Sequence, residues 1–120
     1  MLAAGQIRAD DAGLLDHGVI DGLRAVFGER TGMLLSRTRQ MVAERMEQIG
    51  RTDPCVEAEA LARLAHEVGG MAGQVGMAAL SLEALALERL CRQGEHDAAR
   101  RAAQALAKTA AASLTELPCD

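Results

Sequence analysis

The sequence has almost no aromatic residues: it contains one phenylalanine, Phe27, and no tryptophan or tyrosine. All-β folds depend on aromatic and β-branched residues and on regularly spaced turn residues, so this composition argues against a sandwich or a barrel. Alanine and leucine, with 24 and 16 residues, dominate the 120-residue chain. A chain of this length forms one ordinary domain, and we do not expect a multidomain enzyme.

Long apolar runs are also missing. The longest ones, such as Met77 to Leu80, are far shorter than the roughly 20 residues that span a bilayer, so we expect no transmembrane segment and no membrane partner. The first thirteen residues have no basic stretch followed by a long apolar one, which argues against a secretory signal. These observations favour a cytoplasmic protein.

Charge and cysteine content exclude two further classes. Lysine occurs once, at Lys108, and the net charge is −4 without a long run of either sign, so we expect no nucleic-acid partner. The three cysteines contain no Cys-x-x-Cys pair, which predicts reduced thiols and not a disulfide framework. The spacing of cysteines and histidines is also unlike that of metal ligands, so no metal site is expected.

Glycine and proline divide the chain into segments in which apolar residues recur with a helical period. We predict a tail over residues 1–13, followed by a short helix that Asp16 caps. Because the connections are short, neighbouring helices should be antiparallel. The sequence therefore predicts an all-α fold over residues 14–117: an antiparallel up-down four-helix bundle with a short additional N-terminal helix. The expected helices cover residues 16–27, 30–49, 54–75, 78–93 and 95–117, the third beginning at Pro54.

His66 is unusual because of where the helical pattern places it. On the predicted helix 54–75, apolar residues gather within about 60° of Val68, whereas His66 points about 160° away from Val68, into solvent. Three glycines in this helix cost roughly 3 kcal/mol relative to alanine. One explanation is that small residues clear a flat patch around the imidazole; the other is that Gly69 and Gly70 simply end the helix. The neighbours of His66 on the wheel are Ala62, Arg63, Gly69, Gly70 and Gly73.

An exposed imidazole in such a patch suggests group transfer between proteins. A neutral histidine, with an ordinary pKa of about 6.5, is a nitrogen nucleophile that can carry a phosphoryl group as a labile phosphoramidate. We expect Met77 to project to the same side and to contact a partner. The glycine-rich segment 70–76 lacks the lysine and the Ser or Thr of a P-loop and follows no strand, so it does not indicate nucleotide binding.

The segment around His66 resembles the histidine phosphotransfer (HPt) domain family. That family has an Ala-His pair, then an apolar residue, a lysine, a glycine, a small residue and a later glycine. Gly69 stands where the family usually has its lysine. The helix number, order and lengths extend the resemblance, less specifically, over residues 14–117. The residues that match in register are Ala65, His66, Val68, Gly70, Ala72 and Gly76.

The resemblance implies a phosphorelay carrier and not a stand-alone kinase. His66 would accept phosphate from the aspartate of one receiver domain and pass it to another, and Gly70 would let the receiver dock. Response-regulator receiver domains and a hybrid histidine kinase are the implied partners. Mg²⁺ would be held by the receiver and no cofactor by this chain, which we expect to be a monomer.

Gly69 leaves two questions open. Arg63, one turn before His66, is a candidate for the positive charge that the missing lysine would supply. The alternative function is a non-catalytic module that binds or sequesters a receiver or a kinase without being phosphorylated. A purely structural bundle is a third interpretation, and it predicts no affinity for receivers.

Overall fold

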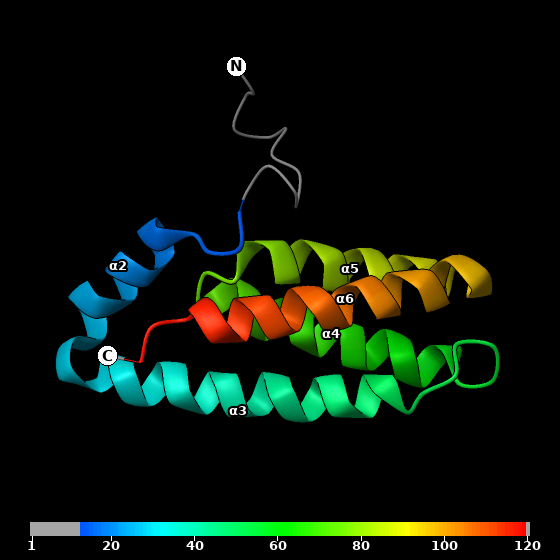
Figure 1. The fold of residues 1–120 in the computed structure, drawn as a ribbon, viewed down its shortest axis with the longest axis horizontal. Coiled ribbons are helices and arrows are strands. Elements are labelled where there is room, and N and C mark those ends of the chain that lie inside the picture. Colours follow the sequence, from blue (N-terminus) through cyan, green and yellow to red (C-terminus); the bar gives the residue numbers. More distant parts are fainter. Residues whose placement is uncertain (1–12, 120) are drawn as a thin grey trace, which may run out of the picture.

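The computed structural model describes residues 13–119, so the predicted tail, apart from Gly13, lies outside the described residues. The helices are α2 (His17–Phe27), α3 (Thr31–Gly50), α4 (Ala58–Gln74), α5 (Ala78–Arg92) and α6 (His96–Glu116), with a 3-10 turn, η2 (Gly28–Arg30), between α2 and α3. In Figure 1, α3 to α6 lie side by side and successive helices run in opposite directions, while α2 lies at one end. The predicted all-α bundle with an additional N-terminal helix is confirmed.

The short helix α2 is tied to the loop between α4 and α5. The Oδ1 atom of Asp16 accepts hydrogen bonds from the backbone N–H groups of Gly18 and Val19 at 3.0 and 3.3 Å, which confirms the predicted cap. The Asp16 N–H donates to the Gly76 carbonyl at 2.7 Å. Gly76 has φ +80°, and a Cβ there would lie 2.8 Å from the Asp16 carbonyl oxygen. Only glycine therefore allows this contact.

The predicted start of α4 at Pro54 is wrong, because the helix begins at Ala58. The Asp53 carboxylate accepts the Cys55 N–H at 2.9 Å, and the Asp53 carbonyl accepts the Val56 and Glu57 N–H groups at 3.1 and 2.8 Å. These bonds close a single turn around Pro54. Glu57 then leaves the helical region, with φ −125° and ψ 41°, so the turn does not continue into α4.

One apolar core runs through the bundle. Its α4 face is the predicted stripe: Leu61, Ala65, Val68, Ala72 and Val75 are buried, while Leu64 and Met71 are partly buried against it. The predicted burial of this stripe is therefore confirmed. Within residues 13–119 no helix is both long enough and apolar enough to cross a membrane.

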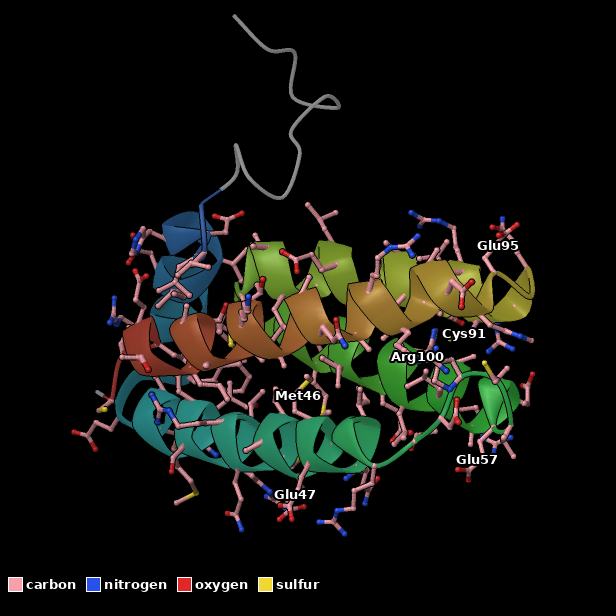
Figure 2. All side chains as sticks on the ribbon, turned by 45° about the vertical axis from the view of Figure 1, so that its right-hand side comes forward. Met46, Glu47, Glu57, Cys91, Glu95 and Arg100 are labelled. Atoms are coloured by element: carbon pink, nitrogen blue, oxygen red, sulfur yellow. The ribbon has the colours of Figure 1, made fainter. Side chains whose placement is uncertain are left out.

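The α3 and α6 helices also pack against each other. Figure 2 shows Met46 of α3 between these two helices. At one end of this contact, the Arg39 guanidinium donates to the carbonyls of Leu114, Leu117 and Pro118 at 3.4, 2.6 and 3.3 Å. Carbonyls at the end of a helix have no partner within the helix, and a cation there also compensates the helix dipole. Arg39 thus fixes the end of α6 on α3.

Candidate functional site around His66

His66 lies in the middle of α4 with its side chain 68% exposed. The helix continues without interruption from Ala58 through Gly69 and Gly70 to Gln74. The alternative that these glycines end the helix is therefore wrong. The predicted exposure of His66 is confirmed, and the ring is carried by a rigid element whose opposite face is anchored in the core.

A carboxylate on α5 holds one nitrogen of the His66 ring. The Nδ1 atom lies 3.1 Å from Oε1 of Glu88, and the Glu88 side chain is only 17% exposed. Burial raises the pKa of the Glu88 carboxyl, but the hydrogen bonds from His66 and Arg92, together with their charges, lower it below its ordinary value of 4.5.

The ionised carboxylate decides the tautomer of His66. A carboxylate without a proton only accepts hydrogen bonds, so Nδ1 must be the donor and carries the ring proton. In the neutral ring the other nitrogen, Nε2, then holds the free lone pair. The structure thus presents Nε2 as the nucleophilic atom of an exposed imidazole.

Glu88 is itself held by an arginine. The Nε atom of Arg92, one turn further along α5, donates to Oε2 of Glu88 at 3.1 Å, and Nη1 donates to Oε1 of Glu59 at 3.0 Å. The hydrogen bonds to Glu59 and Glu88 raise the pKa of the Arg92 guanidinium, which keeps its charge. One polar chain thus links α4 to α5, and it consists of His66, Glu88, Arg92 and Glu59.

The sequence did not reveal the role of Glu88 or Arg92. Glu88 is 22 residues from His66, on the next helix, and the motif around the histidine does not include it. The available signal was the i, i+4 spacing of Glu88 and Arg92 on a predicted helix, which is ordinary for a solvent-exposed ion pair.

The three glycines near His66 have different surroundings. A Cβ at Gly70 would meet nothing within 4 Å, whereas one at Gly69 would lie 2.7 Å from Cδ2 of Leu85 and one at Gly73 would lie 3.1 Å from Oγ of Ser81. Gly69 is buried, so its predicted place on the open patch is wrong. Its lack of a side chain serves the close approach of α5. Gly70 and Gly73 are both exposed, but only Gly70 has open space where a Cβ would lie.

Ala62 and Met77 are also buried, with 0% of their surface exposed. Both were predicted on the surface beside His66, and that placement is wrong. Ala62 lies on the flank of α4 that α5 covers. For Met77, α4 has ended before the residue is reached and Gly76 has turned the chain with φ +80°, so the wheel of α4 no longer gives the direction of its side chain.

Two further arginines lie near His66, one on α4 and one on α3. Arg63 is exposed, one turn before His66, and makes no hydrogen bond or ion pair within residues 13–119. Arg45 of α3 donates to Glu67 at 2.9 Å and thereby connects α3 to α4 next to the histidine. Arg63 is therefore an exposed cation one turn from His66, without a partner among residues 13–119.

The other two histidines lie elsewhere: His17 is the first residue of α2 and His96 the first of α6.

Comparison with known protein families shows the family to which the chain belongs. The model of the Hpt domain family matches residues 33–116, from the first turns of α3 to the end of α6. The chain belongs to the Hpt domain family. The resemblance seen in the sequence is thereby confirmed.

A solved structure supports the same fold for this Hpt domain. Histidine-containing phosphotransfer protein B (HptB) from Pseudomonas aeruginosa PAO1 is similar with a TM-score of 0.81 and 24% sequence identity, over 87% of this chain and 90% of that chain. The comparison with curated proteins gave no match. Histidine phosphotransfer in phosphorelays is the function of Hpt domains, with receiver domains and histidine kinases as the partners of the family.

Proposed function

We propose that this Hpt domain carries a phosphoryl group on Nε2 of His66, accepting it from the aspartyl phosphate of one receiver domain and passing it to the aspartate of another. The observation that carries the proposal is the pairing of an exposed imidazole with Glu88, whose carboxylate holds Nδ1 at 3.1 Å. A free lone pair on the solvent side is what an attack on phosphorus requires.

The reaction is a transfer between two nucleophiles. The Nε2 lone pair forms the nitrogen–phosphorus bond, the bond from phosphorus to the aspartyl oxygen breaks, and the electron pair returns to the aspartate carboxylate. The imidazole ring becomes positively charged during this step, and Glu88 stabilises that charge through the Nδ1–H group. The second transfer is the reverse of the first, with another aspartate as the acceptor.

The remaining chemistry belongs to the partner. The receiver would hold Mg²⁺ and the reacting aspartate, while this chain supplies one oriented imidazole and a surface on which the receiver can lie. Gly70 supports such docking, because it is exposed and the space where its Cβ would be is open. Arg63 supports it as a cation on the same face, one turn from His66.

The test is phosphate transfer from a panel of phosphorylated receiver domains to the wild type and to His66→Gln. We expect an acid-labile label on the wild type, which a phosphoramidate would give, and no label on the variant. Binding of each receiver is measured separately, because glutamine at position 66 should leave the docking surface intact.

An unlabelled wild type that still binds receivers would contradict the proposal and support the sequestering module instead. A chain that neither binds nor accepts phosphate across the panel would support the structural bundle. A label that persists in His66→Gln would show that another residue is the acceptor.

A further inference from the structure

Phosphorylation of His66 would bring two anionic groups close together. The Glu88 carboxylate lies 3.1 Å from Nδ1 of the ring, and a phosphoryl group adds a charge of about −1.5 to −2 at neutral pH. Glu88 is also mostly shielded from water, with 17% of its side chain exposed. Like charges separated by only the width of an imidazole repel each other, and shielding from water strengthens the repulsion. The carboxylate that aids the attack would therefore also oppose its product.

Arg92 is placed to offset the repulsion between the Glu88 carboxylate and the phosphoryl group. Its Nε atom binds Oε2 of Glu88, the oxygen that His66 does not use, at 3.1 Å. Its Nη1 atom is at the same time held by Glu59 at 3.0 Å. A planar guanidinium with two fixed contacts restricts the rotation of the carboxylate that it binds. One residue thus both orients Glu88 and offsets its charge.

We propose that Arg92 is a positioning residue for phosphoryl transfer, which keeps Glu88 aimed at Nδ1 of His66 and compensates its negative charge when Nε2 is phosphorylated. The inference rests on the proposed function. Without Arg92, Glu88 is free to rotate away from Nδ1, and its charge faces the phosphoryl group without compensation. The decrease in the rate of phosphoryl transfer on loss of Arg92 must therefore depend on the charge of Glu88.

The dependence on Glu88 is tested with Arg92→Gln, Glu88→Gln and the double variant in the full chain. The initial rate of phosphorylation by a phosphorylated receiver is the readout. We expect Arg92→Gln to slow transfer roughly three-fold or more, as for coupled residues in direct contact. In the Glu88→Gln background the same substitution should change the rate by less than about two-fold, because no carboxylate remains to be compensated.

Two further variants separate this role from general stability. Arg100→Gln is the matched control, because Arg100 is also an ion-paired arginine and binds Asp53 at 3.3 Å. Its side chain is 48% exposed, against 44% for Arg92. Figure 2 shows Arg100 on α6 at the end of the bundle where α3 connects to α4. The Arg100→Gln variant should accept phosphate at the wild-type rate. Arg92→Lys keeps the positive charge but loses the planar pair of contacts, so it should recover only part of the rate that Arg92→Gln loses.

The ring tautomer gives a readout that needs no phosphate. Nitrogen-15 NMR of the unphosphorylated wild type should show His66 protonated on Nδ1, and Arg92→Gln should increase the share of the ring protonated on Nε2. The proposal is overturned if Arg92→Gln leaves tautomer and rate unchanged, or slows transfer equally with and without Glu88. If the wild type accepts no phosphate, the proposed function fails, while the tautomer still decides whether Arg92 positions Glu88.

Discussion

The Leu85 side chain occupies the space beside Gly69: its Cδ2 atom lies 2.7 Å and its Cγ atom 2.9 Å from where a Cβ at Gly69 would be. The Ser81 hydroxyl donates to the Gly69 carbonyl at 2.8 Å, so α5 meets the backbone of α4 directly. Glycine at this position is thus explained by packing between two helices. The lysine that resembling sequences have there would require Leu85 to move.

Replacing Gly69 by alanine should destabilise the bundle. Alanine gains about 1 kcal/mol of helix propensity over glycine, but overpacking a tight contact costs about 1–3 kcal/mol. The free energy of unfolding in urea should therefore fall, by about 1 kcal/mol. An increase would show that Leu85 can move aside without cost.

Gly70→Ala is the matched control on the neighbouring residue and should have the opposite effect. Nothing lies within 4 Å of a Cβ at Gly70, so the gain in helix propensity, about 0.5–1 kcal/mol, has no steric cost to offset it. A larger side chain, as in Gly70→Phe, should leave the fold intact and weaken receiver binding, measured by calorimetry. Undiminished binding would place the docking surface elsewhere.

Met77→Ala should act on stability, because its side chain is fully buried. Truncating a buried methionine costs about 2–5 kcal/mol, and the free energy of unfolding should fall by that amount. Receiver binding by the fraction of protein that remains folded should be unchanged. Weaker binding without any loss of stability would restore the surface role predicted from the sequence.

Stability should depend on the ionisation of Glu88. Its folded-state pKa is lowered from 4.5, so the stabilisation is complete above the unfolded-state pKa and is lost as the pH falls through the lower folded-state value. Unfolding of the wild type and of Glu88→Gln is compared from about pH 7 to about pH 3. The advantage of the wild type should shrink at the acidic end. An advantage independent of pH would mean that Glu88 contributes as a neutral group.

Arg63→Ala should slow the formation of phosphohistidine or shorten its lifetime. The reason is electrostatic, because Arg63 is an exposed cation, one turn from His66 and without a partner within residues 13–119. The decay of acid-labile label after removal of the receiver measures the lifetime. If formation and lifetime both match those of the wild type, Arg63 does not replace the missing lysine.

Periodicity and caps in the sequence were sufficient to predict most of the fold. Gly94, with φ +73°, follows the end of α5, and Asp16 caps α2. The apolar stripe of α4 around Val68 marks its core face. Each of these features depends on a pattern of residues close together along the chain. The predicted start at Pro54 failed because a local cap can close a single turn as well as begin a helix. Only the backbone at Glu57 distinguishes the two outcomes.

The sequence by itself determined that His66 points away from the core, since the direction of a side chain around a regular helix depends only on its position in the helix. Tertiary structure decided what surrounds it. Ala62 and Gly69 lie on the flank of α4 that α5 covers, and a helical wheel does not show how closely a second helix approaches. The same approach brings Glu88 to Nδ1 of His66, because packing, and not distance along the chain, sets contacts between helices.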